Sequence, residues 1–117
     1  MPGAGGSVME APPKELDGAA VIYYVVLSEK HRRTGACRHF VDGQLMGPVP
    51  ALAICRYDGE DAAYLFHCGD GWGVITDDLF ASVEDALEQA AIQYEGLDRG
   101  DWVKVSDYPP LAPPTAI

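Results

Sequence analysis

The cysteines and histidines are the side chains of this sequence that could bind a metal ion. The chain has three of each. Cys37 and His39 are separated by one residue, and His67 and Cys68 are adjacent, so the two pairs could together supply four zinc ligands. Structural zinc sites, however, usually place two cysteines two to four residues apart. Adjacent residues of a strand also point to opposite faces of a sheet, so His67 and Cys68 could not easily hold one ion. The sequence therefore predicts no metal site and no cofactor.

A cysteine nucleophile with a histidine base is the second chemistry that these residues could perform. Cys37 or Cys68 would attack the substrate, and the base would be one of the histidines His31, His39 and His67. Neither cysteine opens a helix, where the pKa of its thiol would fall, although Arg38 and His39 lie beside Cys37. Free cysteine is most often a small core side chain, so we expect reduced, buried thiols and predict no catalytic residue. A small Cys/His-dependent enzyme is the alternative function.

Two further sequence patterns are better explained by a local structural role than by catalysis or ligand binding. Asp77 and Asp78 precede a predicted helix, where an acidic pair more often caps or solvates a turn than transfers protons. Residues 69–73, Gly-Asp-Gly-Trp-Gly, have the composition of a phosphate loop, but they lead from one strand into another rather than into a helix N-terminus. Asp70 and Gly71 are therefore predicted to form a two-residue hairpin turn.

The element that can be predicted most firmly is a helix over residues 82–95. Apolar residues from Val83 to Tyr94 recur at helical spacing and form one stripe. Ser82 is a suitable N-cap, with Asp85 placed to complete a capping box, and Gly96 provides a stop.

The remaining elements are predicted to be short strands. Their β-branched and aromatic residues place them at 20–27, 37–41, 44–46, 51–57, 62–68, 72–76 and 101–105. If Asp70 and Gly71 form the turn, Phe66 pairs with Ile75; a three-residue loop would pair Phe66 with Val74 instead.

These elements predict an α+β fold, with an antiparallel sheet of about five or six strands and the 82–95 helix on one face. Residues 19–107 would form the single domain, residues 1–18 a disordered N-terminal tail, and residues 108–117 a proline-rich C-terminal tail. One helix covers one face, and the 20–27 strand is apolar on both faces, so we expect a homodimer to cover the other. The alternative is a sheet that curls and closes on its own side chains.

The compartment can be predicted from what the sequence lacks. Its longest apolar run, residues 19–27, is nine residues long, which is too short to span a bilayer. No basic segment followed by an apolar one opens the chain, so no secretory signal is predicted. We expect a cytoplasmic protein that does not enter a membrane.

Charge is distributed unevenly along the chain, whose formal net charge is −10. Residues 30–56 contain five basic residues and one acid, whereas residues 58–107 contain thirteen acids and two basic residues. An acidic protein lacks the basic surface that nucleic acid or an anionic membrane requires, so both are unlikely partners by composition. The basic loop formed by Lys30, Arg32 and Arg33 is the one feature that leaves a regulatory, nucleic-acid-associated role open.

The acidic second half is the natural complement of a basic protein. The residues that we expect to contact such a partner are Asp77, Asp78, Glu84 and Glu88, with Trp72 as a possible anchor. Tryptophan contributes a large contact area to binding surfaces, although Trp72 and Trp102 also suit a core or an interface. The sequence therefore favours a non-enzymatic binding protein.

Residues 64–96 resemble a group of small uncharacterised bacterial proteins. The likeness lies in the run from Tyr64 to Asp77, in Ser-Val-Glu-Asp-Ala at 82–86, and in Ala-Ala-Ile-Gln-Tyr-Glu-Gly at 90–96. The shared pattern is a strand ending in cysteine, a turn, a tryptophan-containing strand ending in aspartate, and a helix. Some of these proteins look like immunity proteins of contact-dependent or polymorphic toxin systems. The resemblance implies a bacterial, cytoplasmic, immunity-like protein.

Overall fold

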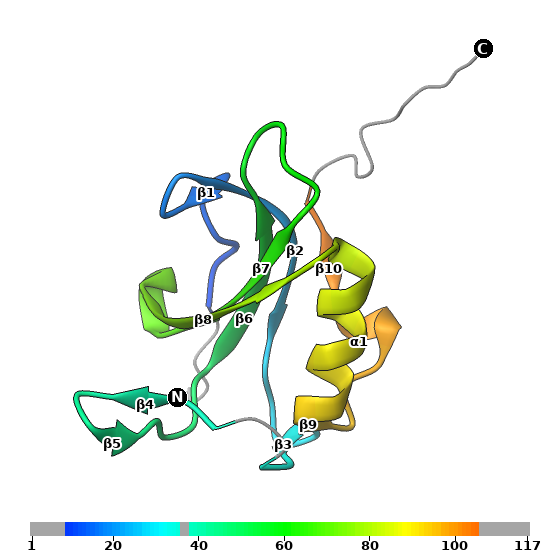
Figure 1. The fold of residues 1–117 in the computed structure, drawn as a ribbon. Helices are drawn as coiled ribbons and strands as arrows, with labels where there is room; N and C mark the ends of the chain where they lie inside the picture. The colour runs from blue at the N-terminus through cyan, green and yellow to red at the C-terminus, as the bar shows by residue number, and fades with distance from the viewer. Residues whose placement is uncertain (1–8, 36–37, 106–117) are drawn as a thin grey trace.

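The main body of the protein is one curled antiparallel sheet of six strands (Figure 1). The computed structural model describes residues 9–35 and 38–105. The strands are β1 (Glu15–Leu16), β2 (Ala19–Val26), β6 (Ala51–Arg56), β7 (Ala63–Cys68), β8 (Val74–Phe80) and β10 (Val103–Lys104). They lie in the order β1-β2-β6-β7-β8, and β10 also pairs with β2. The predicted α+β class and strand number are therefore confirmed. Cys37 lies outside the described residues.

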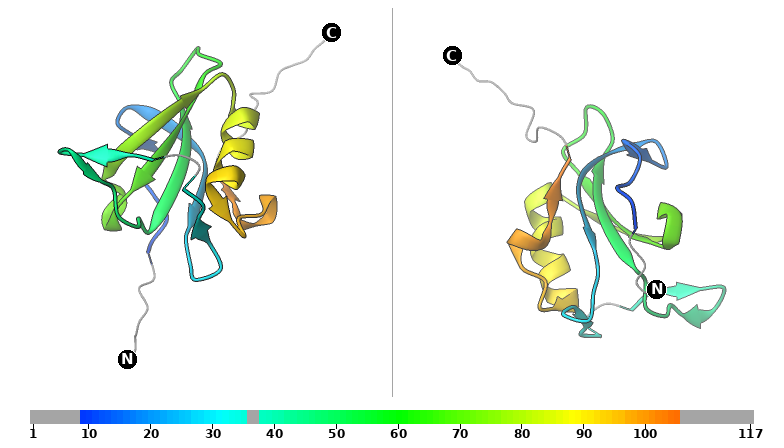
Figure 2. Two further views of the ribbon diagram at one scale, coloured as in Figure 1. Left: turned by 60° about the horizontal axis from the view of Figure 1, so that its bottom comes forward. Right: turned by 180° about the vertical axis from the view of Figure 1, so that it is seen from behind.

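Two short ribbons accompany the sheet. β3 (Arg32–Arg33) pairs with β9 (Tyr94–Glu95), and β4 (Phe40–Val41) pairs with β5 (Gln44–Leu45). The β4–β5 hairpin turns at Asp42 and Gly43, both of which have positive φ, as the two central residues of such a tight turn require. The hairpin projects away from the sheet (Figure 2).

The helix α1 (Val83–Gln93) begins where the capping signal placed it. The side chain of Ser82 accepts a hydrogen bond from the backbone N–H of Asp85 at 3.1 Å, which satisfies one of the unpaired donors of the first turn. Two 3₁₀ turns, η1 (Asp70–Trp72) and η2 (Arg99–Asp101), complete the elements. Within the described chain, no helix has both the length and the apolarity that crossing a bilayer demands.

The register between β7 and β8 differs from both predicted registers. Phe66 pairs with Asp77 and His67 with Thr76, rather than Phe66 with Ile75 or Val74. The reason is the connection: Gly69 to Gly73 close a loop around η1, with the N–H of Gly69 donating to the carbonyl of Gly73 at 2.9 Å. This loop is longer than the two-residue turn that we expected. It moves the partners of Phe66 and His67 two positions along β8, which leaves these side chains on the same face, and an irregularity after His67 pairs Cys68 with Val74.

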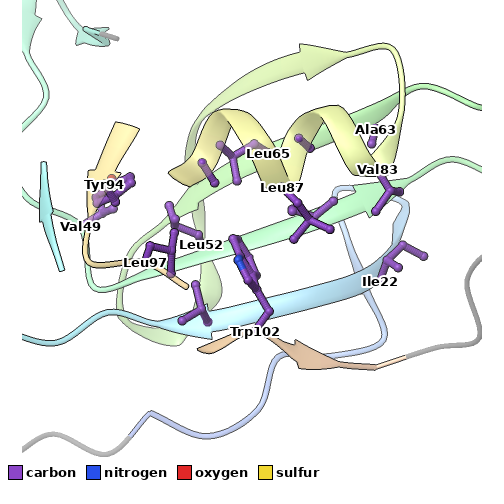
Figure 3. Close-up of a cluster of buried hydrophobic side chains, with 14 of the residues drawn as sticks. Ile22, Val49, Leu52, Ala63, Leu65, Val83, Leu87, Tyr94, Leu97 and Trp102 are labelled. Atoms are coloured by element: carbon purple, nitrogen blue, oxygen red, sulfur yellow. The ribbon is translucent and has the colours of Figure 1, made fainter. Parts of the chain in front are cut away.

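The first hydrophobic cluster lies between α1 and the sheet. Figure 3 shows helix side chains meeting strand side chains in one buried layer, with Trp102 beside them. The members on the helix and the central strands are Ile22, Val25, Leu52, Ile54, Ala63, Leu65, Val83, Ala86, Leu87 and Ala90. The apolar stripe predicted for the helix is therefore the face that it buries.

The second cluster lies on the opposite face of the sheet and is covered by the chain itself. Its members are Leu16, Ala19, Val21, Ala51, Ala53, Cys55, Phe66, Cys68 and Trp72, with Met9 packed against them. Figure 2 shows β1 and η1 on the side of the sheet away from α1. Residues 9–16, which were predicted to belong to the disordered tail, therefore contribute β1 and part of this cover. The homodimer stays a prediction. The apolar face from which we predicted it is covered by residues of the same chain and does not require a second copy.

Gly96 joins β9 to η2 at a point where a side chain would be costly. It has φ +84, and a Cβ at this position would overlap the carbonyl oxygen of Lys30. Gly59 has φ +81 with open space around it, so Gly59→Ala measures the backbone cost alone, about 1–2 kcal/mol. Urea denaturation should show that Gly96→Ala lowers the free energy of unfolding by more than Gly59→Ala does. Equal losses would mean that the contact with Lys30 relaxes freely.

Candidate functional site

Three side chains that could bind a metal ion meet on the helix side of the sheet. His39 precedes β4, His67 lies on β7, and Asp78 lies on β8. Nε2 of His39 is 3.2 Å from Oδ2 of Asp78, and the ring centroids of His39 and His67 are 4.4 Å apart. One ligand atom from each of the three residues lies within 4.8 Å of the others. We call this group the His–Asp cluster.

The His–Asp cluster is closed off by neighbouring side chains. Gln93, at the end of α1, donates its amide N–H to Oδ2 of Asp78 at 3.1 Å. Arg33, Met46 and Tyr94 line the same small cavity as the two histidines. His67 is 1% exposed and His39 is 9% exposed. The two histidines are therefore buried beside the first hydrophobic cluster, and the side chain of Asp78 is 20% exposed.

His67 is held in its neutral form. Burial, and then the neighbouring His39, lower its pKa to about 4, while the carboxylate of Asp78 acts in the opposite direction. Its Nδ1 atom is buried and has no hydrogen-bond partner among the described residues. A buried ring nitrogen in this state is unusual, because nearly all buried polar atoms are hydrogen-bonded.

Cys68 points away from His67, as the alternation of side chains along a strand predicted. It belongs to the second hydrophobic cluster, on the opposite face of the sheet from the His–Asp cluster. Burial raises the pKa of its thiol to about 12, and burial likewise raises the pKa of Cys55 far above its usual range. A thiol needs a lowered pKa to act as a nucleophile near neutral pH. Cys68 and Cys55 therefore lack the properties of a catalytic cysteine.

The basic loop is attached to an acidic segment of the same chain. Nζ of Lys30 lies 2.8 Å from Asp101 and 3.3 Å from Asp98, and Nε2 of His31 lies 3.1 Å from Asp101. The hydrogen bond with Asp101 raises the pKa of Lys30, and the same bond is the main cause that holds the pKa of Asp101 well below its usual range. These ion pairs engage the positive charge of Lys30, which a phosphate group of a nucleic acid would otherwise contact.

Of the two arginines in the basic loop, Arg33 makes a side-chain hydrogen bond within the chain. Nη1 of Arg33 donates to the carbonyl of Met46 at 2.8 Å. Arg32 is exposed and lies opposite Glu95 in the β3–β9 ribbon. Opposite charges across a strand pair attract, so Glu95 would compete with an external anion for Arg32.

The residues predicted to contact a basic partner do not lie on one surface. Trp72 is 5% exposed, and its indole N–H donates to the carbonyl of Glu10 at 2.7 Å. Asp78 faces His39, and Glu84 forms an ion pair with Arg99 at 2.7 Å. The other two members, Asp77 on β8 and Glu88 on α1, are exposed. They make no ion pair with the residues that the structure describes.

Asp77 belongs to a feature that the sequence analysis missed. In the described chain β8 pairs only with β7, so it is an edge strand of the sheet. Its exposed side chains alternate with inward ones, and Ile75 and Leu79, on either side of Asp77, are 42% and 58% exposed. The signal was present in the sequence, because residues 74–80 read as one strand once the η1 loop is recognised. We call Ile75, Asp77 and Leu79 the β8 edge.

Comparisons with protein-family models, curated proteins and solved structures match nothing. The functional interpretation therefore depends on the geometry of two features. One is the buried His–Asp cluster, and the other is the exposed β8 edge.

Proposed function

We propose that this protein is a non-enzymatic binding protein that docks a basic protein partner along the β8 edge. The observation that carries the proposal is the exposed Asp77 between two exposed apolar side chains on an edge strand. An unpaired strand edge offers a row of backbone hydrogen-bonding groups to another chain. The partner would therefore contribute an extended segment that adds to β8.

The pattern of side chains sets the chemistry of that segment. Ile75 and Leu79 would accept apolar side chains, and Asp77 would accept a lysine or an arginine between them. A second copy of this chain is a poorer occupant of the same edge, since it would bring two aspartates close to one another, and like charges opposite each other destabilise strand pairing. The net charge of −10 would also steer a basic partner towards the protein before contact.

The setting that we propose is the cytoplasm of a bacterium, with an immunity-like role. In that role the basic partner would be a toxin, and the binding protein would act by occupying it. The resemblance of residues 64–96 to immunity-like proteins supports this proposal, and β8 lies within the matching segment. An enzyme that uses Cys68 gains no support, because Cys68 is buried and its pKa is raised, whereas Cys37 lies outside the described residues.

The test begins by capturing the partner from the native bacterium and purifying it. Association rates are then measured over a range of salt concentrations for three charge reversals. These are Asp77→Lys on the β8 edge, Glu88→Lys on the helix, and Asp58→Lys in the turn between β6 and β7. The three variants change the net charge equally, so they differ only in position.

We expect Asp77→Lys to slow association most, to flatten its salt dependence and to weaken affinity by about tenfold or more, which corresponds to about 1.4 kcal/mol. Its free energy of unfolding should change little, since Asp77 is exposed. If the three variants have equal effects, the acidic protein attracts its partner only through its total charge, and the β8 edge is not the docking site.

A further inference from the structure

We propose that His39, His67 and Asp78 bind a divalent transition-metal ion, for which zinc is the probe of choice. Two imidazoles and one carboxylate form a ligand set that zinc accepts. The proposal concerns a second site, on the helix side of the sheet, and it does not depend on partner binding at the β8 edge. It also replaces the expectation of no metal that the spacing of cysteines and histidines suggested.

The distances within the His–Asp cluster suit one ion. Zinc binds nitrogen and oxygen ligands at about 2.0–2.1 Å, so ligand atoms around a tetrahedral ion lie about 3.4 Å apart. The His39 nitrogen and the Asp78 oxygen are already 3.2 Å apart. All three ligand atoms lie within 4.8 Å of one another, so small side-chain rotations would bring them into a single coordination shell.

A separate observation points to a ligand at this place. Nδ1 of His67 is buried without a hydrogen-bond partner among the described residues, in a side chain that is 1% exposed. Leaving such an atom unsatisfied is costly. A metal ion is one way to satisfy a buried imidazole nitrogen.

The surroundings resemble the outer shell of a metal site. The amide of Gln93 donates to the carboxylate of Asp78 and so fixes its orientation, as second-shell partners do for metal ligands. His67 and Asp78 lie on adjacent paired strands, which holds the two residues in a fixed relation. Arg33 lines the same cavity, but its Nη1 donates to the carbonyl of Met46. Its charge should therefore weaken metal binding without blocking it.

The choice of metal follows from the ligand atoms. No thiolate of the described cysteines reaches the His–Asp cluster, because Cys68 and Cys55 belong to the cluster on the other face of the sheet. Nitrogen and carboxylate ligands without sulfur suit zinc, cobalt or nickel better than copper(I).

The experiment measures metal binding to tag-free, chelator-treated full-length protein. Zinc chloride is titrated by calorimetry and in competition with a fluorescent chelator, and cobalt chloride is added to record its visible absorption bands. We expect one ion per chain and cobalt bands typical of low coordination number. Asp78→Asn and His39→Asn should weaken zinc binding by more than about a hundredfold, since loss of an outer-shell partner alone costs about 10–100-fold.

Control variants separate this site from adventitious binding. His31→Asn removes a histidine that lies near Asp101, and Cys68→Ala removes a thiol on the other face; both should bind zinc as the unchanged protein does. Arg33→Gln should bind zinc more tightly. Circular dichroism checks that every variant is folded. The proposal is overturned if the unchanged protein binds no zinc, or if folded Asp78→Asn and His39→Asn bind it with unchanged affinity.

Discussion

Replacing Leu87 with alanine should lower the free energy of unfolding by about 2–5 kcal/mol. Leu87 is 2% exposed and sits in the middle of the first hydrophobic cluster, between the helix and the central strands (Figure 3). Truncation removes the apolar contacts of the side chain and leaves a cavity that the rigid sheet cannot collapse to fill. Urea denaturation followed by circular dichroism measures the loss.

The control for this substitution lies on the same helix. Ile92 is 52% exposed. Ile92→Ala therefore shortens a side chain of similar size that already lies partly in solvent, and it should change the free energy of unfolding by no more than about 0.5 kcal/mol. Alanine raises the helix propensity at both positions, slightly more at Ile92 than at Leu87. Similar losses at Leu87 and Ile92 would mean that the apolar stripe is not the buried face of α1.

Cys68 should react with a thiol reagent at least about 10³-fold more slowly in the native protein than in the unfolded chain. Burial raises the pKa of its thiol from 9.0 to about 12, and each pKa unit reduces the thiolate fraction tenfold. Cys68 is also 0% exposed, so the reagent reaches it only after local opening. The measurement uses a variant with Cys37→Ser and Cys55→Ala, in which Cys68 is the only thiol.

The same variant in concentrated urea gives the reference rate at the same pH. Circular dichroism confirms that it is folded without urea. If native Cys68 reacts within tenfold of the unfolded rate, its thiol is accessible and ionised, and a Cys68-dependent enzyme becomes the better interpretation of the protein.

The local elements could be predicted because short-range signals specify them. The stripe from Val83 to Tyr94 and the cap at Ser82 defined α1, and the apolar run at residues 20–27 defined β2 to within one or two residues. The turn at Asp42 and Gly43 was also predictable, since few residues tolerate positive φ. Each of these features depends on neighbours in the sequence.

The features that were missed depend on contacts between distant segments. Trp72 adopts φ +69 inside the η1 loop, and its indole bonds to Glu10; no local rule places a tryptophan there. That loop sets the register of β8, which places Asp78, rather than Thr76, opposite Leu65 and so near His67. The cover provided by residues 9–16 was missed for a related reason, because they belong to the segment 1–18, whose glycine-, alanine- and proline-rich composition resembles a tail.

Amide hydrogen exchange of the protein with and without its purified basic partner tests docking at the β8 edge most directly. The free protein should exchange readily at the outward-facing amides of β8, which have no strand partner on that side among residues 9–35 and 38–105. In the complex, we expect slower exchange at residues 75–79 and little change at β1 or in the turn between β6 and β7. Protection confined to the helix or to the β6–β7 turn, with β8 unchanged, would contradict the proposed docking mode.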